Sequence, residues 1–111
     1  MKVRVTTKNY EREVLESELP VLVEFFADWC GKCAMLEDAV EEIAEEQEGI
    51  LKVCQIEIEE SAKLAQEFEV EVVPTFVIFR NGKPVSAASG VLHKETVLEM
   101  LREETGIYVG H

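Results

Sequence analysis

Residues 21–33 read VLVEFFADWCGKC, and this stretch decides the fold. It begins with a nearly continuous apolar run, residues 21–26, which is typical of a central parallel strand covered on both faces. Two cysteines, Cys30 and Cys33, follow three positions apart in the expected first turn of a helix. Their α-carbons then fall about 5–6 Å apart, the separation that a disulfide requires. The pair can therefore close into a disulfide and reopen with little backbone movement.

The start of a helix also activates a cysteine, because its unpaired N–H groups and its dipole favour a thiolate over a thiol. We therefore expect Cys30 to act as a nucleophile and Cys33, one turn deeper, to resolve a mixed disulfide. The alternative is that the pair forms half of a zinc site, which needs four ligands. Further ligands could come only from Cys54, His93 and His111, with no second close pair. We therefore expect no metal.

The spacing of apolar and turn-forming residues predicts the remaining elements. Expected strands are 3–5, 51–56 and 75–79, with Asn81-Gly82 as the turn of a hairpin to 85–88. Expected helices are 10–17, capped by Asn9; 30–48; a short one capped by Ser61; and 94–105. Val14, Leu15, Met35, Leu36, Val40 and Ile43 are expected to face inward. The order βαβαβαββα predicts an α/β fold, with a mixed sheet flanked by helices on both faces.

Composition and charge argue against several classes of function. Acidic residues outnumber basic ones 23 to 11 in the 111 residues, for a formal charge of −12. No basic stripe is available to neutralise phosphates, and anionic membrane surfaces would repel the chain, so we expect neither nucleic acid nor membrane as a partner. No secretion signal opens the sequence, and three cysteines are too few for a disulfide-stapled scaffold. We expect a cytoplasmic protein, although a domain cut from a secreted precursor would look the same.

The chain resembles the thioredoxin family over essentially its whole length. The matching residues are Phe25, Phe26, Ala27, then Asp28-Trp29-Cys30-Gly31-x-Cys33, Val73-Pro74-Thr75, Phe79-x-Asn81-Gly82 and Gly90. Their spacing matches as well as their identity. The resemblance implies a single thioredoxin domain over residues 1–111, the thioredoxin fold and a thiol–disulfide exchange activity.

The resemblance also implies roles for individual residues. Cys30 corresponds to the attacking cysteine and Cys33 to the resolving one, which together form the redox-active disulfide. Glu24 falls where the family usually carries a buried aspartate that helps to deprotonate the resolving thiol. Pro74 corresponds to the family's cis-proline. The expected substrate-docking surface comprises Trp29, Gly31, Val73, Pro74, Thr75 and Gly90.

Two of these residues have simpler readings that the sequence leaves open. Glu24 could reach the edge of the sheet and water, because buried carboxylates are uncommon. If it is buried, desolvation raises its pKa and makes it a candidate proton acceptor near neutral pH. Trp29 could be only a packing residue, although interfaces are rich in aromatic side chains.

Four positions depart from the family's common pattern. Lys32 replaces a proline between the cysteines, Ala34 replaces a lysine, Asp38 stands where a proline is common, and Gln55 replaces a lysine near the buried acid. We expect Gly31 and Lys32 to modulate the redox pair. An ammonium at position 32 favours a neighbouring thiolate, and a stabilised thiolate makes the disulfide a stronger oxidant. We therefore expect a somewhat less reducing protein than a typical member.

The sequence thus predicts an enzyme, a protein-disulfide oxidoreductase that reduces its substrates through a Cys30/Cys33 dithiol–disulfide cycle. We expect no bound cofactor, a monomer, and a thioredoxin-reductase-type electron donor, which the resemblance suggests to be a flavoprotein that uses NADPH. A disulfide oxidase or isomerase is one alternative, favoured by Lys32. A non-catalytic thioredoxin-like interaction module is another, although a binding scaffold has no need of two oxidisable thiols.

Overall fold

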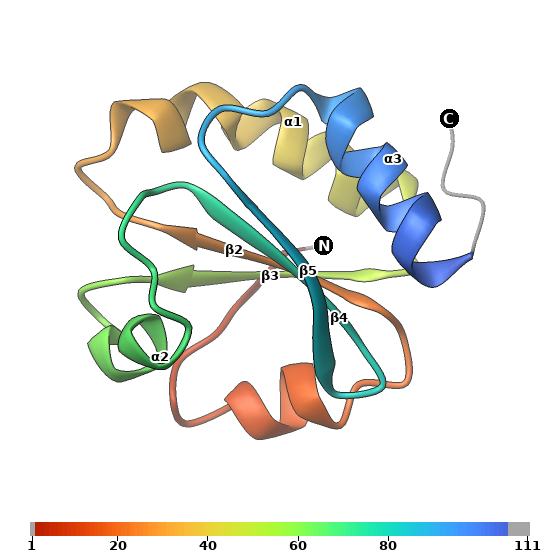
Figure 1. Ribbon diagram of the computed structural model, residues 1–111, viewed down its shortest axis with the longest axis horizontal. Helices are drawn as coiled ribbons and strands as arrows, with labels where there is room; N and C mark the ends of the chain where they lie inside the picture. Colours follow the sequence, from red (N-terminus) through yellow and green to blue (C-terminus); the bar gives the residue numbers. More distant parts are fainter. Residues whose placement is uncertain (1, 107–111) are drawn as a thin grey trace.

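The computed structural model describes residues 2–106, which form a five-stranded sheet between two layers of helices (Figure 1). The strands are β1 (Lys2–Arg4), β2 (Val21–Phe26), β3 (Lys52–Glu57), β4 (Thr75–Arg80) and β5 (Lys83–Ser89). The helices are η1 (Glu11–Leu15), α1 (Gly31–Glu46), α2 (Ala62–Glu67) and α3 (Lys94–Thr105). The order of strands across the sheet is β1-β3-β2-β4-β5.

The sheet is mixed, as the sequence predicts. β1 and β2 both pair in parallel with β3, while β4 is antiparallel to β2 and to β5. Parallel neighbours require crossover connections, and η1 and α1 lie within them. The β4–β5 hairpin turns at Asn81 and Gly82, whose φ values of 53° and 77° suit a tight two-residue turn. A side chain at Gly82 would also approach the Leu15 carbonyl oxygen to 2.7 Å, so glycine is required there.

Each face of the sheet has its own core. α1 and α3 cover one face and α2 and η1 cover the other, with β2 between them (Figure 1). Alternate residues of β2 therefore serve different cores: Leu22 packs with the α1 and α3 side chains, whereas Val23 and Phe25 pack on the opposite face. This arrangement buries residues 21–25 and explains their apolar character. Glu24 is the exception in that run.

The first helix differs from the sequence-based prediction. η1 is a π-type segment of five residues and not a helix over 10–17. The Asn9 side chain does not cap it, because Asn9 Oδ1 accepts from the Thr6 N–H at 2.8 Å and its amide donates to the Arg4 carbonyl. These bonds close the turn that precedes the helix. Val14 is buried as expected, but Leu15 is 38% exposed, so its inward placement was wrong.

The long helix begins one residue later and ends two residues earlier than expected. Its buried positions are Cys33, Leu36, Val40, Ile43 and Ala44, a single stripe at helical spacing. Met35 falls on the opposite side of the helix from this stripe and is 72% exposed, so its assignment to the core was wrong. In the short helix α2, Ser61 occupies the N-cap position as predicted, but its side chain makes no capping hydrogen bond.

Candidate active site

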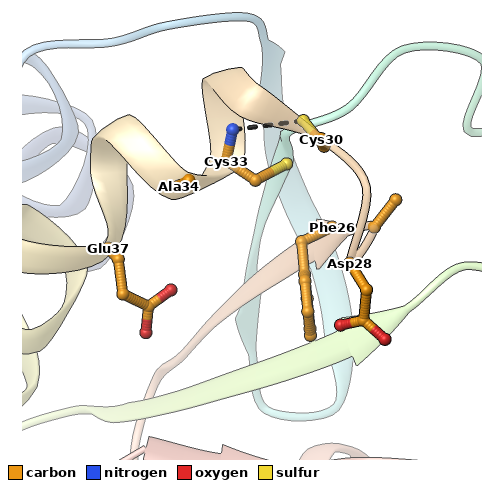
Figure 2. A pocket seen from close by; sticks show the side chains of 7 residues that line it. Phe26, Asp28, Cys30, Cys33, Ala34 and Glu37 are labelled. Carbon is orange, nitrogen blue, oxygen red and sulfur yellow. Dashed lines mark hydrogen bonds between the residues drawn. The ribbon is translucent and has the colours of Figure 1, made fainter.

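The two cysteines lie at the junction of β2 and α1, at the carboxyl end of the middle strand of the sheet. Cys30 is the N-cap residue of α1, and its Sγ accepts a hydrogen bond from the Cys33 N–H at 3.1 Å (Figure 2, dashed line). This N–H and the helix dipole both stabilise negative charge on the Cys30 sulfur. Both residues are free thiols and largely buried, Cys30 at 8% exposed and Cys33 at 4%. Cys30 is thus placed to be the attacking sulfur.

A groove of about 400 Å³ opens on one side of Cys30. Its lining comes from two chain segments: Trp29, Gly31 and Lys32 at the start of α1, and Glu71, Val72 and Val73 before β4. Trp29 is 66% exposed, so the reading of Trp29 as a packing residue alone is wrong. Within residues 2–106, neither Lys32 nor Glu71 forms an ion pair. The groove is therefore an open surface with exposed apolar groups and two unpaired charges.

The segment before β4 brings main-chain groups to the redox pair. Cys30 Sγ lies 3.7 Å from the Val73 carbonyl oxygen. The Val73–Pro74 peptide bond is cis, as the resemblance implies. Val72, in the turn before Pro74, lines the groove beside them and is 49% exposed. An extended segment of another protein lying in the groove would meet both backbone and apolar side chains here.

Thr75 and Gly90 lie behind the groove and do not line it. Thr75 is buried; its hydroxyl donates to the Val72 carbonyl and lies 2.9 Å from Ser89 Oγ. The Gly90 N–H donates to the Pro74 carbonyl at 2.8 Å, with φ at 94°, a conformation that favours glycine. The structure shows both residues bracing the loop. Direct contact with a substrate stays a prediction for each.

A cavity of about 370 Å³ opens on the other side of Cys30. Its lining residues are Phe26, Ala27, Asp28, Cys30, Cys33, Ala34 and Glu37. Figure 2 shows the Cys33 sulfur extending from α1 towards the space above Phe26, while the Glu37 carboxylate extends from the same helix to one side of the Phe26 ring. The Cys33 thiol therefore faces a space large enough for water and does not line the groove.

Glu24 is buried beside this cavity, on the face of β2 that carries Phe26. It is 1% exposed, and one of its oxygens accepts a hydrogen bond from the Gln55 side-chain amide at 2.8 Å. The reading in which Glu24 reaches the sheet edge and water is therefore wrong. Burial, the main cause, raises the pKa of Glu24 to about 7. A carboxyl group with such a pKa can accept a proton near neutral pH and release it again.

The Cys33 thiol would need such an acceptor to react at neutral pH. Burial first, and then its hydrogen bond with Cys30, raise the pKa of the Cys33 thiol above the ordinary value of a cysteine. Cys33 therefore stays protonated at neutral pH unless a base removes the proton. Glu24 is close enough for its charge to contribute to that raised pKa.

Glu57 is a supporting residue that the sequence analysis did not single out. Its buried carboxylate accepts from the N–H groups of Glu59 and Glu60 at 2.8 and 2.7 Å, and from Asp28 N–H at 3.3 Å. It thereby ties the end of β3 to the loop that carries the cysteines. Burial opposes its ionisation, but these three donors outweigh that effect and lower the pKa of Glu57. Nothing in the sequence distinguishes Glu57 from other acidic residues at the ends of strands, so its role in holding the cysteine loop could not be predicted.

The third cysteine lines neither opening of the site. Cys54 is fully buried in β3, as the sequence predicts for a small apolar residue, and burial raises the pKa of its thiol to about 12. His93 precedes α3, its side chain makes no capping bond, and His111 lies outside the described residues. Among residues 2–106, no three His, Cys, Asp or Glu side chains gather in a way that could hold a metal. No helix in this range is long and apolar enough to cross a membrane.

Comparison with known proteins agrees with this geometry. Residues 1–103 match the family model described as thioredoxin. The chain is 37% identical over 103 residues to the thioredoxin of Rickettsia felis, covering 93% of this chain and 98% of that protein. It is 37% identical to thioredoxin 1 of Nostoc and 38% identical to the thioredoxin of Pyropia yezoensis, each over 100 residues, 90% of this chain and 94% of the relative. The fold, the placement of the cysteine pair and these relatives agree: the chain belongs to the thioredoxin family.

Proposed function

We propose that this protein, a thiol–disulfide oxidoreductase by family, reduces disulfide bonds in other proteins. One observation carries the proposal: the Cys30 sulfur lies between an open groove and a buried second thiol. The groove offers a place for an extended protein segment, and the second thiol offers a way to release it. An oxidase or isomerase would use the same atoms in another direction; Lys32, which lines the groove, favours it, and the redox potential tests that alternative.

The proposed reaction has two exchanges. Cys30 thiolate attacks one sulfur of a substrate disulfide, so a mixed disulfide forms and the other substrate sulfur leaves as a thiolate. Cys33 then passes its proton to Glu24, and its thiolate attacks the Cys30 sulfur. The Cys30–Cys33 bond forms as the bond between Cys30 and the substrate breaks. The substrate gains two electrons and the protein is left as a disulfide.

The proposal includes the partners that the cycle requires. The disulfide form must be reduced again, and we place a thioredoxin-reductase-type flavoprotein with NADPH in that role. The family in general uses protein disulfides and such a reductase. We further propose that the protein works as a monomer in the cytoplasm, without a bound cofactor of its own.

The direct test is reduction of insulin by dithiothreitol with and without the protein. The wild type should accelerate the precipitation of insulin chains, and Cys54→Ala, which alters a buried thiol that lines neither opening, should do the same. No acceleration by a protein whose Cys30 and Cys33 are shown to be reducible would favour the interaction module instead. Equilibration with glutathione gives the potential; a value more negative than those of related thioredoxins would contradict the role proposed for Lys32.

A further inference from the structure

A cluster of three charged side chains joins the first strand to the long helix. The Lys2 ammonium binds the Glu37 carboxylate and lies 2.9 Å from Glu41. The Lys2 side chain is only 16% exposed, whereas the two carboxylates are about half exposed. Burial alone would lower the pKa of Lys2, but the two carboxylates outweigh it and raise the pKa, so the ammonium stays charged. The cluster holds a partly buried positive charge against α1.

This cluster lies on the same face of the sheet as Glu24. β1 and β2 both pair with β3, with Lys2 opposite Val53 and Glu24 opposite Gln55, so the four side chains share one face. Glu37 also lines the cavity into which Cys33 extends (Figure 2). Within the described residues, Lys2 pairs with the two helix carboxylates and forms no ion pair with Glu24.

The charged and titratable groups around Glu24 come from two of the elements packed against it. α1 contributes Glu37 and Cys33, and β1 contributes Lys2. β3 contributes the neutral amide of Gln55, and β4 places the uncharged Phe76 opposite Glu24. After burial, which raises it, and the Gln55 hydrogen bond, which lowers it, Glu37 raises the pKa of Glu24 and Lys2 lowers it. The two members of one ion pair thus act on the buried acid in opposite directions.

Resting on the proposed function, we propose that Glu37 is a positioning residue for the release step: it holds the Lys2 ammonium against α1 and away from Glu24. An ammonium free to turn towards Glu24 would pair with the carboxylate and weaken it as a proton acceptor. With Lys2 held by Glu37, the carboxyl of Glu24 is left free to take the proton from Cys33 Sγ. The step moves one proton and uses no other reactant. Gln55 donates a hydrogen bond to Glu24 but carries no charge. Lys2 is therefore the cation that acts on the pKa of Glu24.

The test measures the titration of Glu24 directly. Carbon-13 labelled glutamate reports the Glu24 carboxyl by NMR in the reduced protein, without substrate, for the wild type, Glu37→Gln and Lys2→Met. Glu37→Gln should lower the titration midpoint by at least about 0.3 pH unit, well within the range by which neighbouring charges move carboxyl groups. Lys2→Met should raise it. Asp38→Asn removes the same charge from the next residue of α1, off the cavity, and should leave the midpoint unchanged.

A double-mutant cycle separates positioning from simple repulsion. If Glu37 acts by holding Lys2, the downward shift caused by Glu37→Gln should shrink in the Lys2→Met background, because there is no ammonium to release. Equal shifts in the two backgrounds, or a Glu37→Gln midpoint equal to that of Asp38→Asn, would overturn the proposal. Lys2→Gln, which keeps a polar end, serves if Lys2→Met does not fold.

A kinetic readout connects the cluster to the reaction. The pH at which release of a mixed disulfide reaches half of its maximal rate should follow the NMR midpoint in each variant, while the rate of the first attack by Cys30 stays unchanged. Release that ignores the NMR shift would overturn the link to the reaction. Failure of the wild type to reduce insulin would instead overturn the proposed function, and the NMR result would still decide the positioning of Lys2.

Discussion

The two openings that meet at Cys30 are built in contrasting ways. On the groove side the lining is main chain, exposed apolar side chains and two charges that pair with no other described residue. On the cavity side a thiol and a carboxyl group are buried, and the Glu37 carboxylate of the lining is paired with Lys2. The groove side is suited to contact with many partners, since main-chain and apolar contacts do not require particular side chains in the partner. The cavity side is suited to moving a proton, because burial makes its acid respond near neutral pH.

The cysteines themselves give the largest expected difference between the two sides. Cys30→Ser should lower the rate of disulfide exchange by about a thousand-fold or more, because the nucleophile is lost. Cys33→Ser should leave the first attack intact and stop at a mixed disulfide that mass spectrometry detects. The comparison breaks down if Cys33→Ser turns over as fast as the wild type, or if Cys30→Ser still forms the covalent adduct.

Glu24 gives the next largest effect, on stability. Its carboxyl has an ordinary pKa of 4.5 in the unfolded chain and about 7 in the folded protein. The folded state therefore binds the proton more tightly, and its stability falls as pH rises from the lower value to the higher. The interval corresponds to about 3 kcal/mol for this almost fully buried group.

Glu24→Gln removes that dependence. Between about pH 5 and about pH 8, the free energy of unfolding of the variant should gain about 2–3 kcal/mol relative to the wild type. Urea denaturation of the reduced proteins at both pH values measures it. Glu99→Gln, at an exposed position on α3, should follow the wild type. Parallel pH profiles for Glu24→Gln and the wild type would show that the buried carboxyl is not the titrating group.

The two sides also differ in how far sequence reveals them. The cysteine pair, the apolar strand before it and the Asn81-Gly82 turn carry local signals, and each is confirmed in the structure. The burial of Glu24 depends on which strand lies at the centre of the sheet. Its position in an apolar run indicates that burial, but nothing local fixes its pKa.

Contacts between distant segments escaped prediction for a physical reason. Lys2 and Glu37 are 35 positions apart, and only the pairing of β1 with β3 brings them together. A signal for Glu37 was present nonetheless: it lies four residues after Cys33 and therefore on the same side of the helix. At Asn9 the sequence did carry a local signal, the preference of asparagine for the N-cap position. The side chain instead makes two hydrogen bonds that close the preceding turn, so the helix is not capped.

The charges of the groove give the smallest expected effect and the finest distinction between the sides. Glu71 lines the groove, is exposed and pairs with no other described residue, so it can attract a basic side chain next to a substrate disulfide. Exposed charge pairs contribute about 0.2–1 kcal/mol, which corresponds to a change in kcat/KM of up to about fivefold. Glu71→Lys should therefore lower kcat/KM for a disulfide peptide with a flanking arginine and raise it for the matched glutamate peptide. Lys32→Glu should shift the same preference the other way.

Salt and a matched charge reversal decide whether the groove or the overall charge is responsible. The preference of Glu71→Lys should fade as ionic strength rises, because exposed charges are screened. Glu99→Lys changes the net charge of the protein by the same amount on α3, outside the groove. It should leave the ratio of kcat/KM between the arginine peptide and the glutamate peptide unchanged. If Glu99→Lys changes this ratio as much as Glu71→Lys does, the preference is due to the net charge of −12. The groove would then recognise only backbone and apolar groups. If only Glu71→Lys discriminates, the groove selects substrates by charge, while the Glu24 midpoint on the cavity side stays where it was.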